Sequence, residues 1–326
     1  MNEGDSPHLI LAPLRGVTIR CFREVFSEAI AEAGFTEAIT PFIPAIIGYD
    51  PLKDRELQPP TSNLQPPTFN LLLTPQFIGK DPAALGECLM RVKDAGFTTA
   101  DLNAGCPDPM VRNKGRGSGL LRTPAVFERM IAVGCEVMGE GRFSVKTRLG
   151  VERGDELLKL MPMINRYPLR FLTVHGRLAR QMYDGVCDRD AVARVVAAAA
   201  VPVVLNGDIG LPPTADDSKR TTTSASASED SKRTTTRTTA VQPSASNLQP
   251  DLMIGRAFVR ALGERDDIGE LLKCYVAASQ AELCGARPVL GRLKELVAYW
   301  KDSPRWRRRW QVIKLTRTVE ELKSLL

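Results

Sequence analysis

Short apolar runs recur along the chain, and each ends in glycine, asparagine, proline or a charged residue. The first is HLILAPL at residues 8–14, and the last is DLMIGRA at residues 251–257. Runs of this kind are typical of parallel strands that are buried on both faces, because helices cover both sides of such a sheet. Five further runs lie between these two, at residues 69–75, 98–105, 142–150, 170–176 and 201–208.

Segments with helical spacing separate several of the apolar runs. Residues 82–95 and 124–138 repeat apolar side chains three and four positions apart, and each opens with a proline, which suits the first turn of a helix. Alternating strands and helices predict an α/β fold with a parallel sheet. A chain of 326 residues has room for a complete (β/α)8 TIM barrel followed by a small second domain. In that fold, chemistry gathers at the C-terminal ends of the strands.

The last part of the chain has a helical pattern of its own. Residues 268–283, 289–300 and 312–326 space their apolar side chains as amphipathic helices do. We therefore predict that residues 1–264 form the barrel and that residues 265–326 form a helical domain.

Residues 212–250 interrupt the barrel pattern. They consist almost wholly of Pro, Thr, Ser, Ala and charged residues, and the heptapeptide DSKRTTT occurs in them twice. A segment of this composition cannot bury an apolar helical face. We expect a low-complexity, mobile insert within the barrel.

Other features bear on the compartment of the protein. No stretch approaches the ~18 uninterrupted apolar residues of a membrane helix, and the first ten residues lack the basic flank and apolar run of a secretory signal. The seven cysteines are spread singly, without the paired spacing of a zinc site or a disulfide framework. We expect a cytoplasmic protein without a membrane segment or a metal site.

The segment that most strongly indicates a catalytic or binding site is DLNAGCPDPMVRNKGRGSGLL at residues 101–121. It combines a strand end with a glycine-rich loop that holds one cysteine, Cys106. A thiol at the mouth of a barrel is placed to meet a ligand, although an inert buried cysteine is the equally simple alternative.

Two further side chains directly follow apolar runs. Lys146 in SVKTR would stabilise negative charge on a bound ring, or it could be a solvated surface lysine. His175 in LTVHGR lies at a strand end before Gly-Arg, which favours a ligand contact over a core histidine.

The last two strands end in turns rich in glycine. Asn206 and Gly207 end what would be the seventh strand of a barrel, and Gly255 and Arg256 end what would be the eighth. Barrels commonly bind phosphate through backbone amides at these two turns, so the pattern predicts a phosphorylated cofactor.

The C-terminal segment is basic and aromatic. Residues 251–326 hold 15 Lys and Arg against 10 Asp and Glu, which accounts for five of the six net positive charges of the chain. The stretch WKDSPRWRRRW at residues 300–310 interleaves tryptophans with arginines, a pattern that suits RNA through phosphate contacts and base stacking. The alternative is a helix with core tryptophans and solvated arginines, and both interpretations could hold at once.

Seven motifs in order resemble the tRNA-dihydrouridine synthase family. They are LAPLRGVT at 11–18, PQFIGKDP at 75–82, DLNAGCP at 101–107, VKTRLG at 145–150, TVHGR at 173–177, LNGDI at 205–209 and MIGRA at 253–257. The resemblance spans most of the chain outside the insert, because the family also carries a C-terminal helical domain.

This resemblance implies an FMN-dependent reductase that uses NADPH and converts uridine in tRNA to 5,6-dihydrouridine. Cys106 would donate a proton to C5 of the uracil while hydride reaches C6. The residues implied in FMN binding are Ala12, Pro13, Leu14, Gln76, Lys146, His175, Asn206, Gly207, Asp208, Gly255 and Arg256. Those expected to contact the tRNA are Asn103, Arg148, Arg177, Tyr183, Arg305, Arg307, Arg308 and Arg309.

Two other functions stay open on the sequence. One is an FMN barrel that reduces a free small molecule, and the other is a flavin-free RNA-binding protein whose barrel has lost catalysis. We expect a monomer in each case.

Overall fold

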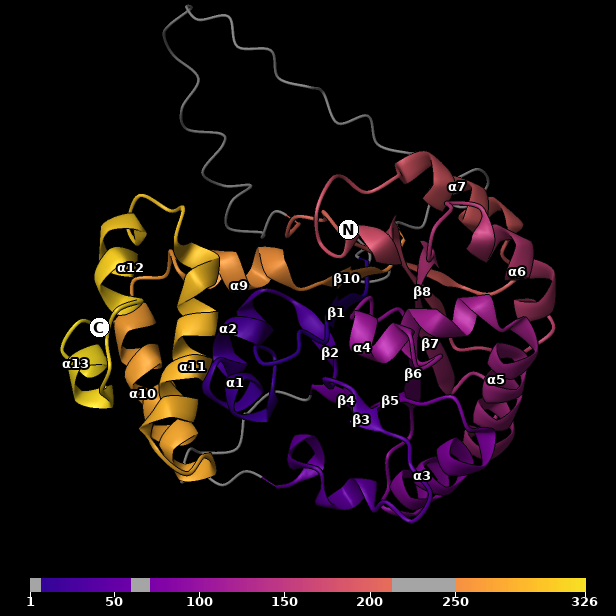
Figure 1. Cartoon of the computed structure of the whole chain (residues 1–326), viewed down its shortest axis with the longest axis horizontal. Helices are drawn as coiled ribbons and strands as arrows, with labels where there is room; N and C mark the ends of the chain where they lie inside the picture. Colours follow the sequence, from indigo (N-terminus) through magenta and orange to yellow (C-terminus); the bar gives the residue numbers. More distant parts are fainter. Residues whose placement is uncertain (1–6, 60–70, 213–249) are drawn as a thin grey trace, which may run out of the picture.

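The computed structural model describes residues 7–59, 71–212 and 250–326. Apart from its two end residues, the insert expected at 212–250 lies outside the described residues. Figure 1 shows a ring of strands with helices around its outer side, and a separate group of helices packed against one flank of that ring.

The described residues hold ten strands in one sheet, and every pair of neighbours runs parallel. The order in the sheet is β3-β5-β6-β7-β8-β9-β10-β1-β2-β4. In chain order the strands are β1 (Leu9–Leu11), β2 (Phe35–Ile39), β3 (Ile43–Pro44), β4 (Leu72–Thr74), β5 (Gln76–Ile78), β6 (Ala100–Ala104), β7 (Phe143–Gly150), β8 (Leu172–Leu178), β9 (Val203–Asn206) and β10 (Leu252–Ile254).

The sheet closes on itself at Pro75. This residue separates β4, which pairs with β2, from β5, which pairs with β3 and β6. Proline has no N–H to give to a ladder, but the Pro75 carbonyl accepts a hydrogen bond from the Asp101 amide at 2.9 Å. β2 and β3 together form one bent strand of the barrel, and so do β4 and β5. The ten strands therefore correspond to the eight strands of a TIM barrel, as predicted.

Helices cover the outside of the barrel and complete the chain (Figure 1). They are α1 (Arg20–Val25), α2 (Ser27–Glu32), α3 (Pro82–Asp94), α4 (Pro109–Arg112), α5 (Pro124–Met138), α6 (Glu156–Ile164), α7 (Arg189–Ala198), α9 (Arg256–Leu262), α10 (Ile268–Glu282), α11 (Ala286–Val297), α12 (Arg307–Ile313) and α13 (Val319–Lys323). The 3-10 helices are η1 (Pro51–Lys53), η2 (Arg55–Leu57), η3 (Gly117–Arg122), η4 (Ala179–Gln181) and η5 (Ala298–Trp300). None of the helices in the described part of the chain is both long and apolar enough to cross a membrane.

Most of the predicted helices are confirmed, but the final one is wrong. The segment 312–326 is not one helix, because α12 ends at Ile313 and α13 begins at Val319. The Thr318 side chain caps α13 by accepting from the Glu321 amide at 3.1 Å, while Glu321 accepts from the Thr318 amide. This capping box starts a new helix within the apolar periodicity.

The interior of the barrel is largely polar. Glu37 of β2 is fully buried and accepts two hydrogen bonds from Arg170, at 2.7 and 2.9 Å, and one from Thr74 at 2.6 Å. A buried carboxylate is tolerated when it is paired and hydrogen-bonded in this way. The apolar part of the interior is a small cluster of Ile10, Ala12, Ile39, Phe171, Val204 and Met253.

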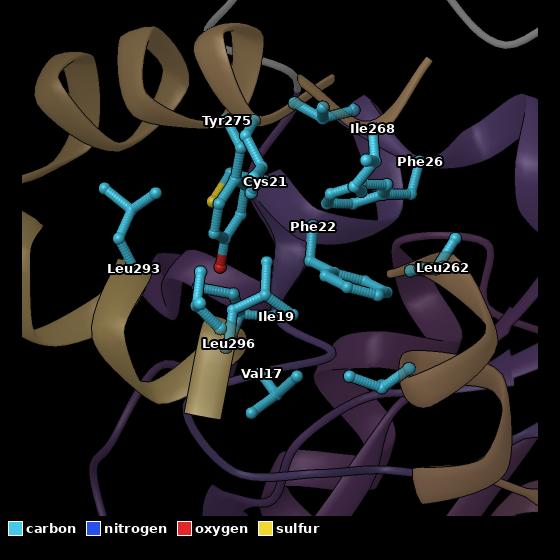
Figure 2. Packing of buried hydrophobic residues seen from close by; sticks show 14 of the residues in the cluster. Val17, Ile19, Cys21, Phe22, Phe26, Leu262, Ile268, Tyr275, Leu293 and Leu296 are labelled. Carbon is cyan, nitrogen blue, oxygen red and sulfur yellow. The ribbon is translucent and has the colours of Figure 1, made fainter. Parts of the chain in front are cut away.

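The C-terminal helices share a hydrophobic core with α1 and α2, the first two helices of the barrel. Figure 2 shows Phe22 and Phe26 next to Tyr275 of α10, with Leu293 of α11 on the far side of Tyr275. The rings of Phe22 and Tyr275 meet edge to face, with centroids 6.3 Å apart. These helices are therefore fixed against α1 and α2 by apolar packing.

The tryptophans of the tail belong to this core. Trp300 and Trp306 are buried, and their indole N–H groups donate to the Val259 and Gly263 carbonyls at 2.6 and 2.7 Å. The expectation that these two rings stack on bases is wrong, because both faces lie inside the protein. Trp310 is half-buried.

Candidate active site

A cavity of about 640 Å³ opens at the C-terminal ends of the barrel strands. A volume of this size is in the usual range for cofactor and substrate sites. Residues from most of the barrel strands line the cavity. They include most of the site residues predicted from the sequence, which are Ala12, Pro13, Leu14, Asn103, Cys106, Lys146, Arg148, His175, Arg177, Tyr183, Asn206, Gly207, Asp208, Gly255 and Arg256.

Some of the predicted site residues lie elsewhere. Gln76 does not line the cavity, because its side chain is fully buried beneath it. Arg305 and the three arginines of α12, Arg307, Arg308 and Arg309, are exposed and do not line the cavity either. Arg309 instead lies over the ring of Trp306, 5.6 Å from its centroid.

Hydrogen bonds hold the loop of Cys106 from both sides. Asn103 Oδ1 accepts from the backbone amides of Gly105 at 3.1 Å and Cys106 at 2.8 Å. On the other side, the amide and the hydroxyl of Ser118 both donate to the Cys106 carbonyl, at 3.1 and 2.8 Å. A β-carbon on Gly117, which has φ +55°, would lie only 2.8 Å from Cys106 Cβ, so glycine is needed there.

The Cys106 thiol is half-buried, and this burial raises its pKa above the ordinary value, more than Arg148 and Arg15 lower it. The thiol therefore carries its proton at neutral pH. A group in this state can act as a general acid towards a bound substrate.

A chain of side-chain hydrogen bonds inside the barrel orients Asn103. Asn103 Nδ2 donates to Gln76 Oε1 at 2.8 Å, and Gln76 Nε2 donates to Asp101 Oδ2 at 2.8 Å. Ser144 donates to the other Asp101 oxygen at 2.6 Å. Burial raises the pKa of Asp101 to about 6, so it is largely a carboxylate at neutral pH. Because that carboxylate accepts only, it fixes which end of each amide points towards the loop of Cys106.

Lys146 and His175 lie on neighbouring strands, β7 and β8, and face the cavity. Burial, with a smaller effect of Arg148, lowers the pKa of Lys146 to about 8, and its Nζ donates to Asn206 Oδ1 at 2.8 Å. Burial also lowers the pKa of His175, and the cations Lys146 and Arg148 lower it further, so the imidazole is neutral. Its Nδ1 is buried without a hydrogen-bond partner among the described residues.

Glycine is required in the turns that follow β9 and β10. Gly207 has φ +96°, and a β-carbon there would lie 2.6 Å from the Cys187 sulfur and 3.1 Å from His175 Nε2. A β-carbon on Gly255 would lie 3.0 Å from that of Ala12. Both turns line the cavity with backbone, as phosphate sites in barrels do.

Arg148 and Arg177 both bond extensively to the protein itself. Arg148 donates from Nε to the Gly105 carbonyl at 2.9 Å and from Nη1 to the carbonyls of Leu178 and Met182. Arg177 donates to both carboxylate oxygens of Asp208, at 2.7 and 2.8 Å. The sequence predicts that these arginines contact the tRNA, but it does not reveal that their hydrogen bonds hold the loops at the cavity mouth.

Tyr183 stands at that mouth with 53% of its surface exposed. The guanidinium groups of Arg148 and Arg256 lie 5.4 and 5.8 Å from the centroid of its ring. Its open position leaves an aromatic surface available to a planar ligand.

Comparison with known proteins adds to this geometry. The model of the dihydrouridine synthase (Dus) family matches residues 10–227. The tRNA-dihydrouridine synthase B of Vibrio cholerae is 30% identical over 206 residues, which are 63% of this chain and 61% of that protein. The tRNA-dihydrouridine(16) synthase of Yersinia pestis is 29% identical over 204 residues, 62% of this chain and 64% of that protein.

A solved structure of the old yellow enzyme homologue from Zymomonas mobilis covers 78% of the chain and 85% of its own, at 13% identity and a TM-score of 0.46. The matches to the two synthases span less than two thirds of the length of each relative. The family model, in contrast, covers well over half of this chain, from β1 past β9. The protein therefore belongs to the dihydrouridine synthase family.

Proposed function

We propose that the protein is a flavin-dependent reductase that converts uridine in tRNA to 5,6-dihydrouridine. The observation that carries this proposal is Cys106, a protonated thiol held at the rim of a barrel cavity by Asn103 and Ser118. Membership of the dihydrouridine synthase family supports the substrate class.

The residues of the cavity fit FMN. The buried Nδ1 of His175 lacks a partner in the described part of the protein and is available to a ligand atom. Lys146 provides a cation for an electron-rich ring, and the backbone at Gly207 and Gly255 provides a phosphate cradle. Ala12, Pro13 and Leu14 form the wall beside this cradle.

When bound, FMN supplies the hydride that adds to C6 of the uracil, and NADPH is the proposed source of its electrons. The Cys106 thiol gives its proton to C5, so hydride and proton together saturate the C5–C6 double bond. Proton donation by a positioned acid contributes about 10²- to 10⁴-fold in rate. The base must leave its stack to enter a cavity at the end of a barrel.

Absorbance spectroscopy and a half-reaction test this function. Purified protein should show flavin bands at about 370 and 450 nm, and the released cofactor should be FMN. After anaerobic reduction with NADPH, addition of unmodified tRNA should reoxidise the flavin, whereas free uridine should not. Reoxidation by a free pyrimidine alone would favour a small-molecule reductase, and colourless protein that still binds tRNA would favour an RNA-binding barrel without catalysis.

A further inference from the structure

Four basic residues lie on and beside the segment that follows Cys106. Arg112 ends α4, Lys114 and Arg116 follow in the next turn, and Lys80 approaches from the loop after β5. The turn is compact, because the Gly115 amide donates to the Arg112 carbonyl at 2.9 Å and the Arg116 amide donates to the Val111 carbonyl at 3.3 Å. A β-carbon on Gly115 would lie 3.5 Å from Lys80 Cδ, so the Lys80 side chain packs against the turn that carries the other three cations.

This basic surface adjoins the cavity. Cys106 and Asp108 line the cavity and lead directly into α4. Gly117, the residue after Arg116, packs against Cys106. A polymer whose reacting base lies at Cys106 therefore crosses or borders this surface.

The described part of the chain does not neutralise any of the four cations. In the described ranges, the side chains of Lys80, Arg112, Lys114 and Arg116 make no ion pair and no hydrogen bond. The Nε atoms of both arginines are buried and have no acceptor there. Arg122, six residues after Arg116, is in contrast paired: it donates to Glu152 at 2.8 Å.

Two acids near these residues in sequence do not act as counter-charges. Asp108 accepts the Met110 amide at 2.8 Å, and Asp81 accepts the Ala83 amide at 3.0 Å. Each of these carboxylates caps the helix that it precedes. A partly buried guanidinium without an acceptor is unfavourable, so the surface is built to receive an anion from outside.

We propose that Lys80, Arg112, Lys114 and Arg116 form a phosphate-binding surface that holds the RNA backbone next to the nucleotide in the cavity. The inference rests on the proposed function only in taking RNA as the substrate. Arginine matches phosphate with two parallel N–H donors, and lysine adds a point charge. Four cations along an open rim suit several phosphodiesters of a strand better than the single 2′-phosphate of a nicotinamide cofactor.

The surface lies apart from the C-terminal helices. In Figure 1, α4 lies over the barrel, whereas α10 to α13 stand together at the left. The arginines of α12 and the basic surface beside α4 would therefore contact different parts of one RNA. Met110, 77% exposed on α4, adds apolar surface beside the cations.

The test compares two double variants with a matched control. Arg112→Ala with Arg116→Ala removes the partly buried pair, Lys80→Ala with Lys114→Ala removes the exposed pair, and Arg122→Ala removes an arginine that already has Glu152 as its partner. The probe is unmodified tRNA, and the readout is its dissociation constant over a range of salt concentrations. Binding needs no turnover, so this result stands even if no dihydrouridine forms.

Each double variant should weaken tRNA binding by about tenfold or more and lower the slope of log affinity against log salt by about 1 for each phosphate that is no longer neutralised. Arg112→Lys with Arg116→Lys should restore most of the slope, and Arg122→Ala should match the wild type. Unchanged tRNA affinity and slope in both double variants would overturn the inference. A raised KM for NADPH with unchanged tRNA binding would also overturn it and assign the phosphate to the electron donor.

Discussion

The Cys106 thiol works only if its loop holds it in place, and the side chains that do so reach deep into the barrel. Cys106→Ala should keep the FMN content and the reduction of FMN by NADPH, because no flavin contact is removed. Dihydrouridine formation should fall by about 10²- to 10⁴-fold, the usual contribution of a general acid. Cys135→Ala, which replaces a thiol buried on α5, should stay near the wild-type rate. Equal rates for the two variants in a single-turnover assay would remove Cys106 from the mechanism.

Asp101 acts on Cys106 through Gln76 and Asn103. Asp101→Asn replaces an acceptor-only group with an amide, which can turn either end towards Gln76 and so allows the chain of amides to reverse. We expect kcat for dihydrouridine formation to fall by about tenfold, the value of one hydrogen bond of ordinary strength, while KM for tRNA stays close to the wild type.

The control for this variant is Ser144→Ala. It removes one hydrogen bond to Asp101 but keeps the carboxylate that orients Gln76. A rise in KM at unchanged kcat in Asp101→Asn would show that the chain of amides shapes binding and not the position of the thiol.

The lowered pKa of Lys146 leads to a prediction of how FMN binding depends on pH. Burial lowers its pKa to about 8, so the cation is present below that pH and is lost as the pH rises through it. Affinity for FMN should therefore fall between about pH 8 and pH 9. Lys146→Arg should abolish this fall, because an arginine stays charged in that range. The measurement is a fluorescence titration of FMN with apoprotein, and identical pH profiles for the two proteins would contradict the assignment.

Residue by residue, the sequence predicts where side chains gather better than what they do. Lys146 and His175 lie within β7 and β8, and Asn206 and Gly255 lie at the ends of β9 and β10. Parallel strands carry such residues to one mouth, so their convergence could be predicted. The hydrogen bonds of Gln76, Arg148 and Arg177 could not. They depend on partners far away in the sequence, and nothing in a linear motif separates a buried amide from one that faces a ligand.

At the scale of elements, apolar periodicity predicts the extent of a strand or helix well, but it predicts poorly where one element ends and the next begins. The run at 69–75 ends at Pro75, and the short β5 that begins directly after it, with other neighbours than β4, is not part of the predicted strand. The periodicity of 312–326 continues across the turn at Thr318, whose capping box divides α12 from α13. The residues of both breaks can be seen in the sequence, but the apolar pattern around them outweighs the local signal.

A buried ion-pair cluster joins α1 to the C-terminal helices. Glu282 of α10 accepts from Arg20 at 2.5 Å and from Arg292 at 2.7 Å, and its side chain is 4% exposed. Glu282→Gln leaves two guanidinium groups facing an uncharged amide. We expect this change to lower the free energy of unfolding by about 3 kcal/mol, measured by chemical denaturation.

The matched control for Glu282→Gln is Glu270→Gln, on the same helix. Glu270 is 77% exposed and pairs with Lys273, so its loss should change stability by less than about 0.5 kcal/mol. Equal stability changes in the two variants would show that the buried cluster does not lock α10 to the barrel.

At the scale of the whole molecule, positive charge gathers at two separate places, the basic surface beside α4 and the α12 segment. Arg307, Arg308 and Arg309 project from α12, whose neighbouring Trp300 and Trp306 anchor the segment in the core. The tail therefore contributes charge on a rigid support and not stacking by these two rings. Changing the three arginines to alanine should weaken tRNA binding and flatten its salt dependence without lowering FMN content. An unchanged salt slope would leave the tail with a structural role alone.

The proposed reduction of uridine within tRNA can be tested directly. Unmodified tRNA is incubated with the protein, FMN and NADPH, and dihydrouridine is followed by mass spectrometry of the digested nucleosides. We predict dihydrouridine at defined positions in tRNA, dependent on NADPH and on Cys106, and none from free uridine. Protein that binds FMN and oxidises NADPH but leaves every tRNA uridine unchanged would contradict this function.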